Sequence, residues 1–301
     1  MIIEQAEVRI VHQPWGSRNL RPWSTLQESG EAIGELRFDR GEARAADGGL
    51  VLELLFTTEP LPIQVHPDDA LARSIGLEHG RTKAWYVLSA APGAMVAVGL
   101  QHRLTFCQIR ASIEDGSIAE RMAWIPVAEG DVVLVPAGTV HALGSGLVVA
   151  EIHSGSDATF RLFDHGSQRE LHVYNAAAAT RAAPIDGRCD PVVVTADRTL
   201  LAACPQFVLE CIDLDPGTSW DLSAERETWI LVLDGCGRVG RTETAVGRAI
   251  FVDRDSTTIT TGAAGLKGLV AYAGGELAPS LLRSTDDRAR LPSARRQQPR
   301  T

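Results

Sequence analysis

Short apolar segments separated by Gly, Pro and Asp recur along most of the chain and predict β-strands. Many short strands at this spacing, each bounded by turn residues, favour an all-β sandwich or barrel. A turn at 234–237 (Asp-Gly-Cys-Gly) is predicted to separate two of the strands. The expected strands are 49–56, 84–88, 131–135, 146–152, 207–213, 228–233, 249–252 and 268–272.

One helical segment interrupts the strand pattern at about 103–124. Thr105 followed by Gln108 has the spacing of a capping box, in which each side chain caps the other residue's backbone. Ser117 and Glu120 repeat this spacing. We therefore expect two short helices inserted between strands.

The chain divides into two parts at residues 176–191, where an Ala-rich stretch passes into Pro, Gly and Asp. We interpret this stretch as a linker between a domain at 1–180 and a second at 190–283. The tail at 284–301 is basic and contains two prolines, so it is expected to be disordered. All eight histidines lie at or before His172, which assigns any imidazole chemistry to the first domain.

Composition limits the possible partners. A net charge of −9 argues against a nucleic-acid surface, which requires a basic stripe. We see neither an apolar run long enough to span a membrane nor a secretory leader, so no membrane partner is expected. The five cysteines are scattered and odd in number, as free thiols in a reducing cytoplasm would be. The oligomeric state does not follow from the sequence.

Two sequence motifs provide candidate metal ligands. Gln64 and His66 are alternate residues of one predicted strand and therefore project from the same face. About 75 residues later, a turn, a strand and the bend at Pro136 and Gly138 lead to His141. An amide oxygen and two imidazole nitrogens suit zinc. Either motif alone is also compatible with a core histidine after a turn.

Several segments in a fixed order resemble type I phosphomannose isomerases of the cupin superfamily. The resemblance implies two cupin domains, each a jelly roll or double-stranded β-helix, with a short helical insertion in the first and no metal in the second. The segments are Gln13-Pro-Trp-Gly16, Ile33-Gly-Glu35, Gln64-Val-His-Pro-Asp-Asp69, Gly80-Arg-Thr-Lys-Ala-Trp-Tyr-Val-Leu88, 130–151 and Ser156-Asp-Ala-Thr-Phe-Arg-Leu-Phe-Asp164.

The family interconverts mannose 6-phosphate and fructose 6-phosphate by moving a proton between C1 and C2 through a cis-enediol. Its metal, usually Zn²⁺, acts as a Lewis acid. The resemblance implies metal ligation by Gln64, His66 and His141, and catalytic roles for Arg161, Glu151 and Asp157. The last two are equally compatible with a strand-end carboxylate and a turn residue.

The fourth metal ligand of the family is a glutamate, and this chain has Lys83 there. At about 5 Å and an effective dielectric near 20, an ammonium repels a dication by roughly 6–7 kcal/mol. Two positions earlier, Arg81 replaces a lysine and presents a fork suited to phosphate. His153, two residues after Glu151, is either a substitute ligand or a supporting residue.

Two further departures concern Glu53, where the family has an active-site lysine, and Pro62, where it favours a serine near the phosphate. Glu53 and Lys83 together look like a charge reversal. We hypothesise that they approach each other inside the barrel, either as a salt bridge replacing the metal or with Glu53 supplying the lost carboxylate. We place Arg81, Lys83 and Glu53 at the substrate phosphate.

The sequence thus predicts a cytoplasmic, zinc-dependent mannose-6-phosphate isomerase acting on a small sugar phosphate. The alternative is a degenerate homologue that binds sugar or sugar phosphate without turnover, because Lys83 occupies the fourth ligand position. A cupin dioxygenase is disfavoured because the two-histidine-plus-glutamate first motif of those enzymes is missing.

Overall fold

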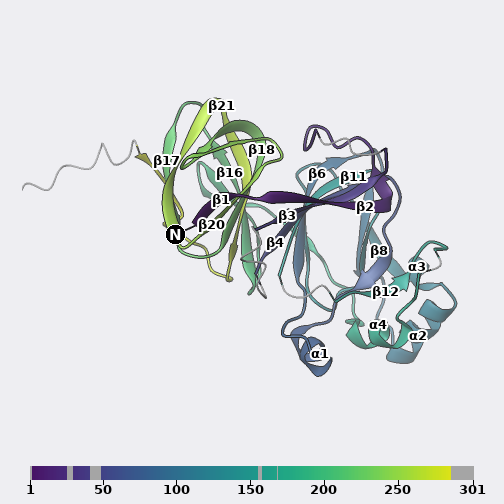
Figure 1. Ribbon diagram of the computed structural model, residues 1–301. Coiled ribbons are helices and arrows are strands. Elements are labelled where there is room, and N and C mark those ends of the chain that lie inside the picture. Colours follow the sequence, from purple (N-terminus) through teal and green to yellow (C-terminus); the bar gives the residue numbers. More distant parts are fainter. Residues whose placement is uncertain (1, 26–29, 41–48, 155–157, 168, 286–301) are drawn as a thin grey trace, which may run out of the picture.

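The computed structural model describes residues 2–25, 30–40, 49–154, 158–167 and 169–285 (Figure 1). Strands dominate this part of the chain, and four short helices accompany them. The all-β fold expected from the sequence is confirmed, with strands at or near each of the eight predicted segments.

The first barrel consists of two antiparallel sheets. The seven-stranded sheet has the order β13 (Arg188–Cys189), β9 (Val132–Val135), β6 (Lys83–Ala90), β11 (Leu147–His153), β4 (Val51–Thr57), β3 (Ile33–Asp39) and β2 (Glu7–Ser17). The five-stranded sheet has the order β12 (Phe160–Phe163), β5 (Ile63–Val65), β10 (His141–Leu143), β7 (Met95–Leu100) and β8 (Met122–Pro126).

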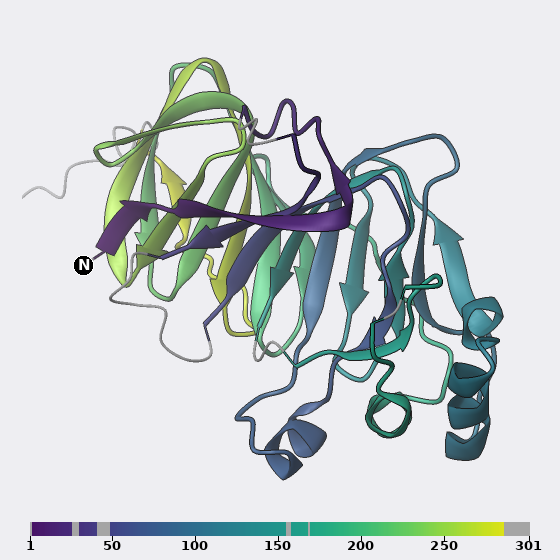
Figure 2. The same cartoon turned by 45° about the vertical axis from the view of Figure 1, so that its right-hand side comes forward.

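The second barrel is a ten-stranded sheet, which the long strand β21 (Asp255–Ala273) closes by pairing with β16, β18 and β17. Strand β1 (Ile2–Gln5) also belongs to it, through its pairing with β20. The chain then continues as β2 into the first barrel, so the N-terminal segment connects the two (Figures 1 and 2). The other strands are β14 (Val192–Thr195), β15 (Arg198–Ala203), β16 (Phe207–Leu214), β17 (Ser219–Ala224), β18 (Thr228–Val239), β19 (Thr242–Ala245), β20 (Ala249–Asp253) and β22 (Leu282–Ser284).

The two barrels pack face to face through one continuous apolar cluster. On β4, the alternate residues Leu52, Leu54 and Phe56 point away from the first barrel and join Trp229 and Phe251 of the second. The intervening residues of β4 must then face the interior of the first barrel, because successive strand residues point to opposite sides. The central strands β4 and β11 of the seven-stranded sheet are therefore buried on both faces.

The helices lie at one end of the first barrel (Figure 1). Helix α2 (Phe106–Glu114) has the predicted capping box between Thr105 and Gln108, with the Gln108 amide donating to the Thr105 hydroxyl oxygen at 3.3 Å. Helix α3 (Ile118–Arg121) is also present, but its cap residue Ser117 makes no capping bond. Helices α1 (Asp69–Ser74) and α4 (Val173–Ala179) were not predicted.

Two local predictions require correction. The expected turn at 234–237 lies inside β18, which continues through it with bulges next to Gly235, a residue with φ of +74°. A left-handed glycine allows the bulge to form without ending the strand. Part of the expected linker at 176–191 is ordered: α4 ends within it, and β13 pairs with β9.

Three further expectations concern the C-terminal tail, the cysteines and the length of the helices. The tail beyond residue 285 lies outside the described residues. Strand β22 ends at Ser284, just before that tail. The five cysteines are free thiols, as predicted. Among the described helices, none has the length and apolar character needed to cross a membrane.

The second barrel contains a buried ion pair. Arg198 on β15 is 2% exposed and Glu210 on β16 is 0% exposed, and the guanidinium donates two bonds of 2.8 Å to the carboxylate. Tyr272 donates to the same carboxylate at 2.5 Å, and Arg198 also donates to the carbonyl of Ala278 at 3.0 Å. The pair therefore fastens the segment after β21 to the barrel wall.

We predict that Glu210→Ala lowers the free energy of unfolding by about 3–5 kcal/mol, because it leaves a buried guanidinium without a counter-charge. Urea denaturation measures this loss. The matched control is Arg198→Met combined with Glu210→Leu, which removes both charges and should recover most of the stability. A single variant within 1 kcal/mol of wild type would contradict this account.

Candidate functional site

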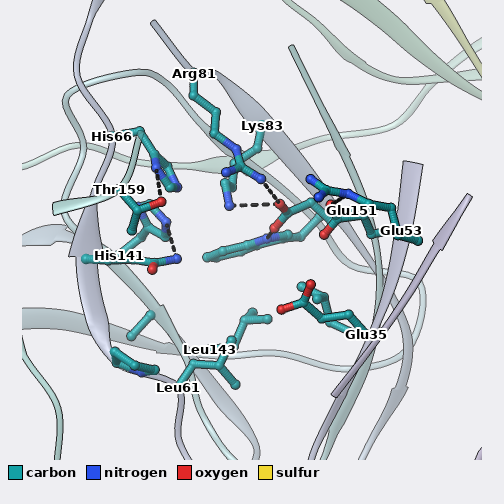
Figure 3. A pocket seen from close by; sticks show the side chains of 16 residues that line it. Glu35, Glu53, Leu61, His66, Arg81, Lys83, His141, Leu143, Glu151 and Thr159 are labelled. Atoms are coloured by element: carbon teal, nitrogen blue, oxygen red, sulfur yellow. Dashed lines mark hydrogen bonds and ion pairs between the residues drawn. The ribbon is translucent and has the colours of Figure 1, made fainter. Parts of the chain in front are cut away.

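A cavity of about 220 Å³ lies inside the first barrel, between its two sheets. Most of its polar side chains belong to segments singled out in the sequence, and they point toward one another (Figure 3). Those from the seven-stranded sheet are Glu35, Arg37, Glu53, Lys83, Trp85 and Glu151; Gln64, His66, Arg81, His141 and Thr159 complete the polar lining.

The three predicted metal ligands form one wall of the cavity. His141 on β10 lies directly opposite Gln64 on β5 in the strand register, and their Nε2 atoms are 3.5 Å apart. His66 follows the end of β5, and its ring centroid lies 4.9 Å from that of His141. The expectation that Gln64 and His66 share a face agrees with this arrangement.

Both histidines use Nδ1 to bind the backbone. His66 Nδ1 donates to the carbonyl of Ala158 at 2.9 Å, and His141 Nδ1 donates to that of Thr139 at 2.8 Å. This fixes the tautomer in which Nε2 carries the lone pair. The Nε2 atom of His66 is buried and has no hydrogen-bond partner among the described residues. Backbone-anchored imidazoles with a free Nε2 are typical of metal ligands.

Burial and nearby cations keep both rings neutral. Burial, with Lys83 and Arg81 beside it, holds the pKa of His66 well below its usual value. Burial and the charge of Lys83 lower the pKa of His141 to about 3. Neutral imidazoles are the form that binds a metal.

The opposite wall is a row of charged side chains across adjacent strands. In the register, Arg37 of β3 pairs with Glu53 of β4, Glu53 with Glu151 of β11, and Glu151 with Trp85 of β6. Directly opposed residues of antiparallel strands lie about 5 Å apart, so the two glutamates would repel each other without counter-charges.

Lys83 and Arg81 supply one set of counter-charges. The ammonium of Lys83 donates to Glu151 Oε1 at 2.8 Å, and the indole of Trp85 donates to Oε2 at 2.6 Å. The guanidinium of Arg81 lies 3.6 Å from Glu151 Oε1. Both carboxylate oxygens of Glu151 are therefore engaged.

Arg37 neutralises Glu53 through an ion pair of 2.7 Å. His153 lies 3.4 Å from the same carboxylate, but its Nε2 already accepts a 2.7 Å bond from Arg81. A nitrogen that accepts from a guanidinium carries no proton to donate, so the pair with Arg37 is the stronger contact of Glu53. His153 is thus a buried residue linking Arg81 to Glu53.

The pKa directions follow from this network. Burial favours the neutral form of both glutamates, but neighbouring groups outweigh it. His153, Arg37 and Arg81 hold the pKa of Glu53 below its usual range, and Lys83 and Arg81 lower that of Glu151. Burial lowers the pKa of Lys83, and the charge of Glu151 opposes that shift.

A second set of groups has the composition of a metal site. Ligand atoms of Glu53, Glu151 and His153 lie within 4.8 Å of one another. However, Arg37, Arg81 and Lys83 already neutralise these carboxylates. A cation entering this cluster would have to displace them, which makes the neutral wall the better metal frame.

The frame of Gln64, His66 and His141 fits a metal ion through the buried Nε2 atom of His66, which has no partner among the described residues, and that of His141, whose one contact is the Gln64 amide at 3.5 Å. The fourth position does not add a carboxylate. Lys83 stands there with its ammonium bound to Glu151, close enough to depress the pKa of both histidines. The site therefore fits a metal through three neutral ligands.

The cavity includes seven of the nine residues proposed from the sequence: Gln64, His66, His141, Arg81, Lys83, Glu53 and Glu151. Arg161 lies opposite Gln64 on β12, but its guanidinium reaches Asp164 and the carbonyl of Glu170. Asp157 lies outside the described residues. Pro62 lines the cavity where a serine was considered typical.

The hypothesis of a Glu53–Lys83 salt bridge requires correction. Lys83 pairs with Glu151, and Glu53 pairs with Arg37. The reason is the strand order β6–β11–β4, which places Glu151 between the two. Glu53 remains near enough for its charge to raise the pKa of Lys83.

Sequence reasoning missed Glu35 and Arg37. Both lie on β3, where alternation places them on the cavity side while Leu36 and Phe38 join the interface between the barrels. The alternation at 33–39 was a usable signal, because two charged residues occupy the positions between apolar ones. Interpreting this signal required knowing that both faces of β3 are covered, one on the cavity side and one by the second barrel.

The sequence and the fold of the chain are similar to those of known proteins. No family model matches the chain. It is 34% identical over 139 residues to the mannose-6-phosphate isomerase of Streptococcus mutans, covering 44% of each protein. It is 34% identical over 131 residues to mannose-6-phosphate isomerase ManA of Bacillus subtilis, covering 41% of each, and 30% identical over 204 residues to GmuF of the same species, covering 63% of each. The chain thus matches from two fifths to under two thirds of these relatives.

Solved structures show the same fold over a longer span. The crystal structure of the mannose 6-phosphate isomerase from Bacillus subtilis has a TM-score of 0.75 at 21% identity, covering 89% of this chain and 98% of that one. A phosphomannose isomerase variant from Salmonella typhimurium has a TM-score of 0.69 at 12% identity, covering 90% and 99%. The chain therefore has the fold of these isomerases, and its similarity to curated mannose-6-phosphate isomerases supports a type I phosphomannose isomerase of the cupin fold.

Proposed function

We propose that this protein is a mannose-6-phosphate isomerase that interconverts an aldose phosphate and a ketose phosphate through a cis-enediol. The observation that carries the proposal is the division of one buried cavity into a neutral Gln-His-His wall and a wall of charged side chains that includes Arg81 and Lys83. The first suits a metal that polarises sugar oxygens, and the second suits an anionic substrate.

Arg81 and Lys83 are the proposed binding groups for the phosphate, and the nearby charge of Glu53 acts on both. Arg81 lies 2.7 Å from the neutral His153 and 3.6 Å from Glu151. The substrate is a small sugar phosphate, and no nucleic-acid or membrane partner is proposed. The site belongs to a first domain of residues 1–180, and residues 190–283 form a second, metal-free domain.

Zn²⁺ is the proposed cofactor, held by Gln64, His66 and His141. When bound there, it would act as a Lewis acid toward the substrate oxygens. The chain's own residues hold the sugar phosphate. Thr159, beside His66 Nδ1 at 3.3 Å, helps to orient that ring.

The roles assigned to Arg161, Glu151 and Asp157 remain proposals. Both oxygens of Glu151 are bonded, so its contribution is to hold Lys83 and Trp85 in place. A contact between Arg161 and the reacting carbons would require its guanidinium to leave the carbonyl of Glu170. Asp157 adjoins this strand in the sequence.

We predict that purified protein loaded with zinc isomerises mannose 6-phosphate and loses at least tenfold in rate after chelation, because the neutral frame then has no Lewis acid. Readdition of zinc should restore the rate. Elemental analysis beside a coupled assay for fructose 6-phosphate provides the measurement. Undiminished turnover by metal-free protein would contradict the cofactor assignment, and no turnover with zinc bound would favour sugar-phosphate binding without catalysis.

We also predict that Lys83→Glu binds zinc at least tenfold more tightly than wild type. The substitution removes the repulsion between an ammonium and the dication and adds a carboxylate ligand. Competition with a chromophoric chelator measures the affinity.

Lys83→Met is the matched control, because it removes the charge at similar length without adding a ligand. Its zinc affinity should lie between those of wild type and Lys83→Glu. Equal affinities for all three proteins would show that position 83 does not influence the metal.

A further inference from the structure

Glu35 is a carboxylate in the cavity that has no hydrogen-bond or ion-pair partner among the described residues. It lies on β3 and points into the cavity (Figure 3). Arg37, two residues later on the strand, also lines the cavity. An unpaired carboxylate open to a substrate cavity is available to a ligand.

The other two carboxylates of the cavity are committed to cations. Glu53 is bound by Arg37 at 2.7 Å, and Glu151 is bound by Lys83 at 2.8 Å. Their lowered pKa values make them weak bases. Glu35 is therefore the carboxylate with the greatest proton affinity in this cavity.

The charges around Glu35 explain that affinity. Burial raises its pKa to about 7, and the negative charges of Glu53 on β4 and Glu151 on β11 add to the shift. The cations Arg37 on its own strand and Lys83 on β6 oppose it. A general base works best with a pKa near the operating pH.

We infer that Glu35 is the acid–base residue that carries the proton between C1 and C2 of the sugar phosphate. The inference rests on the proposed isomerase function and names a group for its central step. Position 53 strengthens it, since Glu53 is the largest charged contributor to the proton affinity of Glu35.

The step balances without a further reactant. The Glu35 carboxylate takes the proton from C2 of the open-chain aldose, the C–H electron pair forms the C1–C2 double bond, and the carbonyl pair moves to O1. The O2 proton passes to O1, and the O2 electron pair forms the C2 carbonyl. The double-bond pair then takes the proton back from the Glu35 carboxyl at C1, which yields the ketose.

The test compares Glu35→Gln with wild type under zinc saturation. We expect kcat to fall at least 100-fold while KM changes less than threefold, because the amide keeps the shape but takes no proton. Glu35→Asp should recover part of the rate. The matched control is Glu31→Gln, the same substitution at an exposed position just before β3, which should keep the wild-type rate.

The pH profile separates proton transfer from a structural role. The base must be ionised, so wild-type kcat/KM should rise with pH through about 7 and level off above it. Glu53→Gln removes the negative charge that raises this pKa, so the rise should move to lower pH. Deuterium from D2O should appear at C1 of the product with wild type, and this exchange should be lost with Glu35→Gln.

Stability provides a check on folding. A carboxyl with a raised folded-state pKa destabilises the folded protein once pH exceeds its unfolded value of about 4.5. Glu35→Gln should therefore be at least as stable as wild type at pH 8. A folded variant that retains more than a third of the wild-type rate, with an unchanged pH profile, would overturn the inference alone. Wild-type protein without turnover would overturn the proposed function and the inference with it.

Discussion

The charged side chains of Glu53 and Glu151 must be neutralised within the first barrel, because the strands that carry them are buried on both faces. Leu52 and Leu54 of β4 pack against the second barrel, so Glu53 between them faces the cavity with little access to bulk water. A buried carboxylate is tolerated only when paired. The packing of two barrels in this way determines the electrostatics of the site, and each ionised group in the row has a partner for this reason.

The same need for pairing separates charged side chains from neutral ones within the cavity. Arg37 of β3 pairs with Glu53, and Lys83 of β6 and Arg81 pair with Glu151. The wall formed by β5 and β10 carries no charged side chain among the described residues that line the cavity. Neutral imidazoles with backbone-anchored Nδ1 atoms can bind a metal, whereas the paired carboxylates cannot do so without losing their counter-charges. The neutral groups and the paired charges therefore occupy separate walls of one small cavity.

Much of the fold and of the metal frame could be predicted from sequence, because both depend on local patterns. Strand alternation placed Gln64 and His66 on one face, and the bend before His141 directed it inward. The pairing of Lys83 could not be predicted, because it depends on which strand lies between β6 and β4. Glu35 was missed because the burial of both faces of β3 arises from packing against a distant segment of the chain.

The departures at positions 53 and 83 act together even though their side chains do not pair. A carboxylate at 53 adds negative charge beside Glu35 and Glu151, and an ammonium at 83 returns positive charge to Glu151. Without Lys83, two opposed carboxylates would share Arg37 and Arg81 alone. Without Glu53, Glu35 would lose the charge that contributes most to its proton affinity. Glu53 and Lys83 thus keep the charges of the barrel balanced, and the negative charge of Glu53 at the same time raises the proton affinity of Glu35.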